Sequence, residues 1–157
     1  MWDLVRFSPA LQPGAENEQA RYIDVRSAGA NFFSSAASLE QGRSAAKRAQ
    51  YLHFPSYEAD IGLVRALKEN ECTLLIAVSD FLDGGQTQVA QKLGRARQLV
   101  FLALHFDCGV RVVTLAREEM ELRSEHELMA IGLLLGFSEQ QMRAQLKEPA
   151  PVVGARK

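Results

Sequence analysis

A chain of 157 residues with 47% hydrophobic residues is long enough to bury one ordinary core, so a single domain is the default expectation. The 18 lysines and arginines nearly balance 19 aspartates and glutamates, which leaves a formal charge of −1. This balance excludes attraction of nucleic acid by bulk charge, so any nucleic-acid interface has to be a local basic patch.

Two absences and the cysteine spacing set the expected compartment. The sequence has no signal peptide and no run of about twenty apolar residues, so we expect a soluble, cytoplasmic protein without membrane contact. Cys72 and Cys108 stand far apart without CxxC spacing, each at the edge of an apolar stretch. They are predicted to be reduced packing residues rather than a disulfide or a redox pair.

Five stretches have strand character. In chain order they are WDLVRF (2–7), RYIDV (21–25), AQYLHF (49–54), TLLIAV (73–78) and VRVVTL (110–115). The last two are the clearest, because they are short, rich in β-branched residues and bounded by polar residues. Near-continuous apolar runs of this kind are typical of strands that are covered on both faces.

Helical patterns lie between these strands. Residues 59–70 carry apolar side chains at helical spacing, with acidic residues at the start, where the helix dipole is positive. A longer helix is predicted over 85–106, closed by Cys108-Gly109, with Gln88, Lys92 and Arg95 on its polar side. Its predicted apolar stripe consists of Val89, Leu93, Ala96, Val100 and Ala103.

Two consecutive helices are predicted to end the domain. Ser124 can cap a helix over 125–135, with Glu127 as its capping-box partner, and Gly136 stops that helix. Ser138 can then cap the last helix, EQQMRAQL. We expect one domain over residues 1–148, followed by a flexible tail over 149–157 that contains prolines and a glycine.

The alternation of strands and helices predicts an α/β fold built from parallel βα units with right-handed crossovers. A closed eight-unit barrel needs about 250 residues. The chain therefore holds at most a partial or shortened TIM-like barrel, or a small open sheet.

Three stretches resemble a known family in the same order. They are CTLLIAVSDFL, GRARQLVFLALHFDCGVRVVTLA and ELRSEHELMAIGLLLGFSEQQMRAQL, and YLHFPSYEADIGLVRALKENE resembles the strand and helix that precede them in that family. The family is archaeal ribonuclease P protein component 3, the thirty-kilodalton subunit family. The resemblance covers roughly residues 49–147 of this chain. The strand ending Thr114-Leu115-Ala116-Arg117 departs from the family pattern, and the chain is shorter than family members at its N-terminus.

The resemblance implies a subunit of the ribonucleoprotein that removes the 5′ leader from precursor tRNA. In such an assembly the chemistry belongs to the RNA subunit, which uses Mg²⁺, and the protein itself binds no cofactor and has no catalytic residue. The implied partners are the ribonuclease P RNA, precursor tRNA, protein component 2 in a heterotetramer, and the other ribonuclease P proteins.

RNA contacts are expected from cationic residues and from strand ends. Functional loops gather at the carboxyl ends of strands in βα folds, which singles out His53, Ser79, Asp80 and Arg117. Arg123 lies in the loop before a matched helix, and Arg95 matches a basic family position. A short basic cluster, Arg43, Lys47 and Arg48, adds three more candidate RNA contacts. The predicted RNA-binding residues are Arg43, Lys47, Arg48, His53, Arg95, Arg117 and Arg123.

Other interpretations remain open. A metal-dependent phosphoesterase of the PHP type needs clustered ligands, and Asp24, His53 and Asp80 at strand ends are the candidates, although no His-x-His motif is present. DGGQ at 83–86 can receive an anion at a helix start, but an ordinary turn explains it equally well. Finally, the chain can be a protein-interaction module, in which exposed apolar residues, Trp2, Phe32 and Phe33, mark a partner surface. No Ser-His-Asp arrangement is evident from the spacing.

Overall fold

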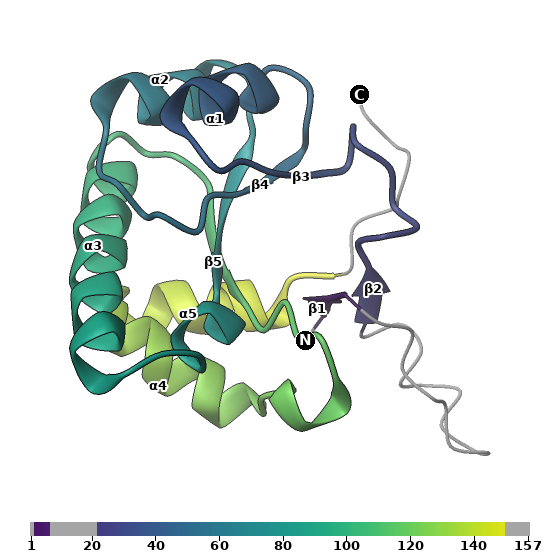
Figure 1. Cartoon of the computed structure of the whole chain (residues 1–157), viewed down its shortest axis with the longest axis vertical. Helices are drawn as coiled ribbons and strands as arrows, with labels where there is room; N and C mark the ends of the chain where they lie inside the picture. The colour runs from purple at the N-terminus through teal and green to yellow at the C-terminus, as the bar shows by residue number, and fades with distance from the viewer. Residues whose placement is uncertain (1, 7–21, 150–157) are drawn as a thin grey trace.

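A computed structural model describes residues 2–6 and 22–149 of the chain (Figure 1). Six short strands alternate with five helices and two short 3₁₀ turns. The elements are β1 (Asp3–Val5), β2 (Tyr22–Asp24), β3 (Phe33–Ser35), α1 (Leu39–Ala46), β4 (Tyr51–His53), α2 (Ile61–Glu69), β5 (Thr73–Ala77), η2 (Val78–Phe81), α3 (Gln86–His105), β6 (Val110–Val113), η3 (Glu119–Glu121), α4 (Glu125–Leu135) and α5 (Glu139–Lys147).

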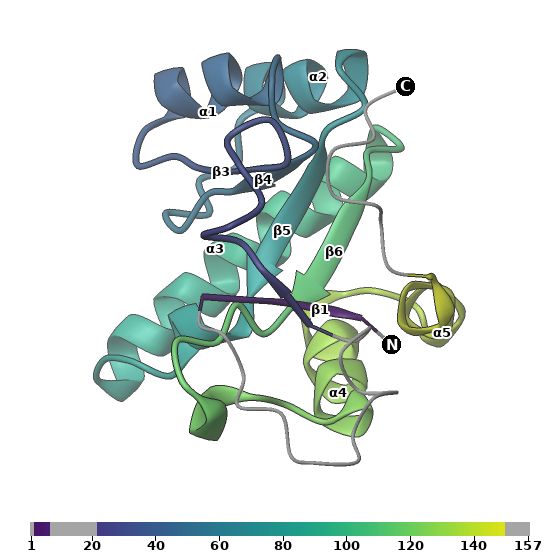
Figure 2. The same cartoon turned by 90° about the vertical axis from the view of Figure 1, so that its right-hand side faces the viewer.

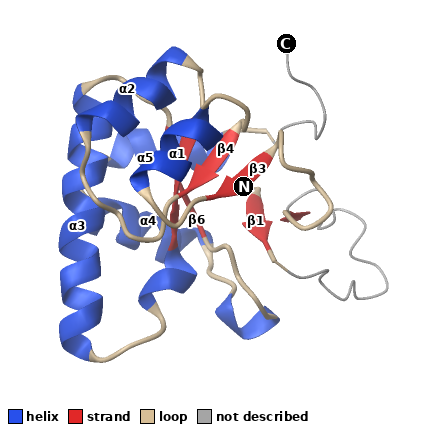
Figure 3. Cartoon of the chain, turned by 45° about the horizontal axis from the view of Figure 1, so that its top comes forward, coloured by secondary structure: helices blue, strands red, loops and turns tan. Residues whose placement is uncertain are grey.

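All paired strands run parallel, which confirms the predicted mixed α/β class. Strands β3, β4, β5 and β6 form one sheet in that order, and β1 pairs with β2 separately. An isolated parallel bridge joins Val5 of β1 to Ala116, just after β6. Figure 1 shows the helices around the four-stranded sheet, with β1 and β2 on its opposite side. Figure 2 shows β5 and β6 side by side, and Figure 3 shows the helices, in blue, surrounding the strands, in red.

The five predicted strands are all present, with shorter bounds. One strand and one helix were not predicted as a unit, namely β3 and α1. Strand β3 has three residues and a single large apolar side chain, Phe33, so it carries no usable alternation. It forms because its backbone pairs with β4, which places Ser35 opposite His53.

Helices α2 and α3 match their predictions in position but differ in detail. Asp60 caps α2 by accepting a hydrogen bond from the backbone N–H of Leu63 at 2.6 Å. The buried stripe of α3 includes Leu99, which was not predicted, whereas Val89 is only partly buried. Helix α3 ends at His105, and the residue with left-handed backbone after it is Asp107 (φ 55°) rather than the predicted Gly109.

The closing helices confirm the predicted caps. Ser124 and Glu127 form a reciprocal capping box at the start of α4, and Ser138 forms another with Gln141 at the start of α5. Gly136 ends α4 with a φ of 102°, a backbone conformation that strains residues with a Cβ atom. On α4 a Cβ atom at Gly132 would lie 2.2 Å from the sulfur of Met142, so this glycine lets α5 pack closely.

Two apolar clusters occupy the two faces of the four-stranded sheet. The first lies between the sheet and the helices, and it receives Leu52, Leu74, Ile76, Val110 and Val112 from the strands. The second lies on the other face, under β1. Its buried members are Trp2, Leu4, Val25, Phe32, Tyr51, Leu75, Ala77, Val113 and Leu115.

This second cluster corrects one sequence interpretation. Trp2 and Phe32 are each only 3% exposed, and Phe33 is partly buried, so these aromatic residues form packing contacts instead of an exposed partner surface. Cys72 and Cys108 are buried, as predicted, and neither forms a disulfide among the residues that the structure describes. Within the described residues, no helix has the length and apolar character needed to cross a membrane. The predicted tail, 149–157, lies outside the described residues except for its first position.

Candidate functional site

Polar side chains meet at the carboxyl ends of three neighbouring strands. Ser35 ends β3, His53 ends β4, and Asp80 lies in η2, directly after β5. The parallel register pairs Ser35 with His53 and His53 with Leu75, so the three strand ends share one edge. His53 is 1% exposed and Asp80 is 7% exposed, whereas Ser35 faces solvent. The structure thus brings together two strand-end residues that the sequence singled out.

The imidazole of His53 connects three groups. Its Nε2 lies 2.8 Å from Oδ2 of Asp80, and its Nδ1 lies 3.0 Å from Oγ of Ser35. Nη2 of Arg6 lies 3.3 Å from the same Nδ1. A guanidinium can only donate hydrogen bonds, so Nδ1 accepts, and the ring proton belongs on Nε2, where it is donated to Asp80. The ring is therefore oriented with Nδ1 toward Arg6 and Ser35 and with Nε2 toward Asp80.

Tyr57 holds the carboxylate of Asp80 from a second direction. Its hydroxyl donates to Oδ2 of Asp80 at 2.8 Å and accepts from the backbone N–H of Ala77 at 3.0 Å. Ala77 extends past the end of the β4 ladder, so this hydroxyl supplies the partner that no strand provides there. Tyr57 itself is fully buried, with a left-handed backbone (φ 50°), and stacks on Phe81. The loop after β4 is thereby tied to the end of β5.

The electrostatics favour an ionised Asp80. Burial raises the pKa of this carboxyl, but hydrogen bonds from His53 and Tyr57, and nearby positive charge that includes Lys92, bring the pKa below its ordinary value. Nζ of Lys92 also donates to the backbone carbonyl of Asp80 at 2.9 Å. This contact shows that Lys92 turns toward the site instead of lying on the polar side of α3, as the sequence suggested. Burial beside Asp80 raises the pKa of Tyr57 well above its usual range, so the phenol keeps its proton.

Two predicted RNA-binding arginines lie beyond β6. Arg117 forms an ion pair with Asp83 at 2.6 Å, and its pKa is raised, first by this hydrogen bond and also by the charge of Asp80. The pair holds the first residue of the DGGQ turn. Arg123 donates to the backbone carbonyls of Met120 and Leu122, and lies only 3.9 Å from Glu127. Both arginines have local partners within the chain.

The other four predicted cationic contacts include three on α1 or just after it. Arg43 pairs with Asp60 at 2.8 Å and so ties α1 to the cap of α2. Lys47 and Arg48 follow the end of α1, and Arg95 lies on α3. These last three are exposed and form no ion pair with the described residues. They are thus the predicted cations with the freest charge in the described part of the chain.

Three members of the strand-end cluster were missed from sequence, namely Arg6, Ser35 and Tyr57. Arg6 lies within the weakest predicted strand, 2–7, and directly after the observed β1, and Ser35 ends a strand that was not predicted. Recognition of β3 would have identified Ser35 by the same strand-end rule that selected His53. Tyr57 lies in a loop after Pro55, and no sequence pattern distinguishes it from an ordinary buried aromatic residue.

The proposed metal ligands are not gathered as a trio. His53 contacts Asp80, whereas Asp24 accepts hydrogen bonds from Arg26, the closest at 2.7 Å. Among the residues that the structure describes, no group of three His, Cys, Asp or Glu side chains could hold a metal ion. The arrangement around His53 is instead a hydroxyl, an imidazole and a carboxylate in sequence, with a guanidinium alongside.

A second buried polar group lies on the same sheet face as His53, two strands away on β6. Arg111 of β6 is 4% exposed and sits over the indole of Trp2, with its guanidinium carbon 3.7 Å from the ring centre. It pairs with Glu148 and donates to the backbone carbonyl of Gln145 at 3.0 Å. These contacts anchor the end of α5 and the N-terminal strand to β6, which is a structural role.

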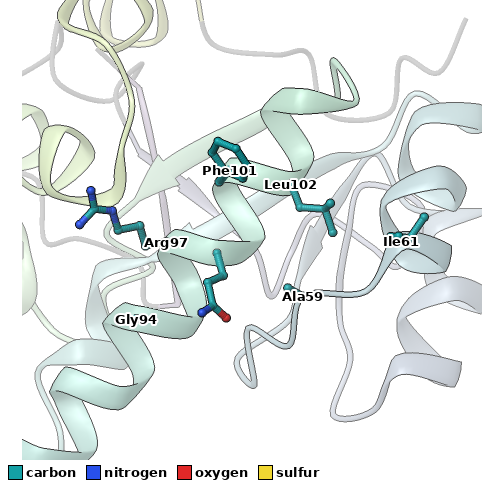
Figure 4. Close-up of a pocket in the computed structure, with 7 residues that line it drawn as sticks. Ala59, Ile61, Gly94, Arg97, Phe101 and Leu102 are labelled. Carbon is teal, nitrogen blue, oxygen red and sulfur yellow. The ribbon is translucent and has the colours of Figure 1, made fainter.

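An apolar groove lies apart from both polar groups. It has a volume of about 710 Å³ and runs between the start of α2 and the middle of α3. Figure 4 shows Leu102 directed toward Ile61, with Ala59 between the two helices. Phe101 is 74% exposed beside it. The groove contains none of the predicted site residues.

Comparison of the chain with models of known protein families and with curated protein sequences finds no match.

Proposed function

We propose that the chain is a protein subunit of ribonuclease P, related to archaeal protein component 3. The observation that carries this proposal is the ordered resemblance over residues 49–147. Its matched stretches correspond to consecutive βα units, β4–α2, β5–α3 and β6–α4–α5, in an all-parallel sheet. The agreement between the order of motifs and the order of units is what supports a common architecture.

The strand order supports the finer proposal of a shortened TIM-like barrel. The sequence of neighbours β3-β4-β5-β6 continues through the bridge of Val5 to Ala116 into β1 and then β2. The backbone N–H of Arg6 donates to the carbonyl of Ala116 at 2.7 Å, and that of Val25 donates to the carbonyl of Val5 at 2.9 Å. In a barrel the first strand lies beside the last, and the inner face is filled by side chains. The second apolar cluster fits such an interior.

In this proposal the protein places cations against RNA phosphates and supplies no catalytic group. Lys47, Arg48 and Arg95 are the strongest candidates, because their charges are exposed and unpaired among the described residues. Arg43, Arg117 and Arg123 contribute after giving up local partners, whereas His53 is 1% exposed and contributes only by holding the strand edge in place. Each phosphate that is neutralised releases counterions, which makes binding depend on salt.

The proposed assembly extends beyond this chain. The RNA subunit carries the Mg²⁺-dependent chemistry, and precursor tRNA is the substrate. Component 2 is the expected protein partner, in a heterotetramer, together with the other ribonuclease P proteins, in the cytoplasm. Lysine and arginine side chains of the protein reduce the repulsion between RNA phosphates. The chain should therefore lower the Mg²⁺ concentration that cleavage requires.

The decisive test is 5′ cleavage of precursor tRNA by the RNA subunit and component 2 at low Mg²⁺, with and without the chain. We expect faster cleavage that depends on the RNA subunit. Equal rates with a folded chain would contradict the proposal. Cleavage of a generic phosphate ester by the chain alone, dependent on divalent metal, would instead favour the PHP-like alternative.

Individual RNA-binding residues can be tested by salt dependence. Combined replacement Lys47→Ala and Arg48→Ala should weaken RNA binding and reduce the slope of log K against log salt by about one for each phosphate that the variant no longer neutralises. Arg143→Ala is the matched control, because Arg143 is exposed but already paired with Glu139 at 2.6 Å. A slope that is unchanged in the double variant would place the RNA elsewhere.

A further inference from the structure

We propose that Ser35, His53 and Asp80 form a nucleophilic triad that hydrolyses small carboxylic esters. This activity is separate from the proposed role in ribonuclease P, because it needs neither RNA nor a protein partner. It assigns Ser35 as the nucleophile, His53 as the general base, Asp80 as the residue that orients the base, and Arg6 as the group that stabilises negative charge.

The distances fit a nucleophile, a base and an orienting carboxylate. Oγ of Ser35 lies 3.0 Å from Nδ1 of His53, and Nε2 lies 2.8 Å from Oδ2 of Asp80. Both separations fall in the hydrogen-bond range expected for an activated serine. Either ring nitrogen of a histidine can act as the general base, provided that the other nitrogen carries the proton. Here the carboxylate fixes the proton on Nε2 and leaves Nδ1 basic.

Burial increases along the triad from the hydroxyl inward. Ser35 is exposed, whereas His53 is 1% exposed and Asp80 is 7% exposed. A substrate can therefore reach the hydroxyl, while the imidazole and the carboxylate are buried behind it. Tyr57 holds Asp80 in place with its 2.8 Å hydrogen bond. A purely structural His53 would already be held by Asp80, so the contact with a solvent-facing serine is the feature that points to chemistry.

Arg6 lies where a developing oxyanion needs a donor. Its Nη2 is 3.3 Å from Nδ1 of His53, the nitrogen that also faces Ser35. When the serine proton reaches Nδ1, this nitrogen can no longer accept a hydrogen bond from the guanidinium. The guanidinium is then free to donate to the substrate oxygen, which gains negative charge in the same step. A cation that changes partner in this way favours the transition state over the ground state.

The reaction balances with water as the co-substrate. Oγ of Ser35 bonds to the ester carbonyl carbon as its proton passes to Nδ1, and the carbonyl π electrons move to oxygen. Collapse breaks the bond to the alkoxide, which leaves as an alcohol with the proton from Nδ1. Water then attacks the acyl-serine, loses a proton to Nδ1, and releases the carboxylic acid as Ser35 regains its hydrogen. No metal or redox partner enters the cycle.

The first test is covalent labelling of the full chain by a fluorophosphonate, which reacts with activated serine and releases fluoride. We expect one adduct by intact mass, located at Ser35 by peptide mapping, and loss of the adduct in Ser35→Ala. The matched control is Ser34→Ala, because Ser34 is the neighbouring residue of the same strand and points to the other face. Labelling that persists in Ser35→Ala, or no labelling of the folded wild type, would overturn the proposal.

The second test separates catalysis from structure by using p-nitrophenyl acetate. Ser35→Ala should lower kcat at least about 100-fold with unchanged circular dichroism, and Arg6→Gln should lower kcat about tenfold with little change in KM. Ester hydrolysis that is equal in wild type and Ser35→Ala would reject the triad even if labelling occurred. Neither outcome depends on the ribonuclease P assay, so the two proposals can fail separately.

Discussion

The two faces of the four-stranded sheet are built from different chemistry. The face toward the helices receives apolar side chains from β4, β5 and β6, such as Leu52, Leu74 and Val112. The opposite face places His53 and Arg111 among apolar and aromatic neighbours. Alternation along each strand separates the two sets, because successive side chains point to opposite faces.

The contrast between the faces indicates where specificity resides in the molecule. Apolar packing tolerates many residue combinations of similar volume, so the helix-covered face stabilises the fold without requiring particular partners. Buried charges and hydroxyls are costly unless each finds its partner, so the inner face tolerates few alternatives. The candidate site lies at the carboxyl edge of that inner face, where such pairing is densest.

The largest effect on stability is expected from removing Arg111, which forms an ion pair with Glu148 from strand β6. Arg111→Ala should lower the free energy of unfolding by about 4 kcal/mol, because it leaves a cavity over Trp2 and removes the donor to the backbone carbonyls of Trp2 and Gln145. Arg111→Met should cost less, since it keeps the volume and leaves Glu148 free to reach water. Denaturation in urea measures both. Equal losses of stability in the two variants would show that pairing, and not packing, dominates at this position.

Next in size is the loss of the phenol that holds Asp80. Tyr57→Phe removes the donor to the carboxylate and the acceptor of the Ala77 N–H, both buried, and should cost about 3 kcal/mol in the free energy of unfolding, measured in urea. It should also raise the pKa of Asp80, because one stabilising hydrogen bond disappears. Tyr51→Phe is the control, since Tyr51 is also buried but lies outside this network, in the apolar cluster on the other face of the sheet. A cost as small as that of the control would mean that the network contributes little to stability.

A pH-dependent effect of about 3 kcal/mol is expected from Asp3. Burial raises the pKa of this carboxyl to about 6, although hydrogen bonds from Thr114 oppose the rise. The folded state therefore holds the proton more tightly than the unfolded state, whose carboxyl titrates near 3.8. Stability contributed by the protonated form is fully present below about pH 4 and is lost as the pH rises through about 6.

Asp3→Asn tests this assignment because the amide has nearly the same shape and cannot ionise. Its stability relative to wild type should increase between about pH 4 and pH 6. At higher pH the wild-type carboxyl has already lost its proton, so the difference in stability should change little. Thermal unfolding at a series of pH values measures the difference. A difference that does not vary with pH would show that Asp3 is ionised normally despite its burial.

The smallest effect concerns the helix-covered side of the sheet. Gly132→Ala should destabilise the chain by about 2 kcal/mol, because the new methyl group meets the buried side chain of Met142. Gly94→Ala is the matched control on α3, where no atom lies within 4 Å of the added Cβ, and should stabilise by about 1 kcal/mol. Adding Met142→Ala to Gly132→Ala should cancel part of the clash, as measured by thermal unfolding. Additive costs in that double variant would contradict direct contact as the cause.

The elements that could be predicted from the sequence are those whose signals are local. The runs of β5 and β6, the period of α2 and α3, and the capping boxes of α4 and α5 all follow from neighbours within a few residues. The parallel α/β class follows from their alternation. These features depend on local hydrogen bonding and on apolar periodicity, both of which are visible in one dimension.

The composition of the candidate site, in contrast, depends on the folded arrangement. Strand β3 forms because β4 offers it a register, and that register alone sets Ser35 against His53. Arg6 reaches the same imidazole from 47 residues away, and Tyr57 reaches Asp80 across 23 residues. Hydrogen bonds between residues this far apart depend on which strands pair and in which register. Strand pairing and register produce no periodic pattern in the sequence. His53 and Asp80 were identifiable as strand ends, but their partners became evident only once the strands were placed side by side.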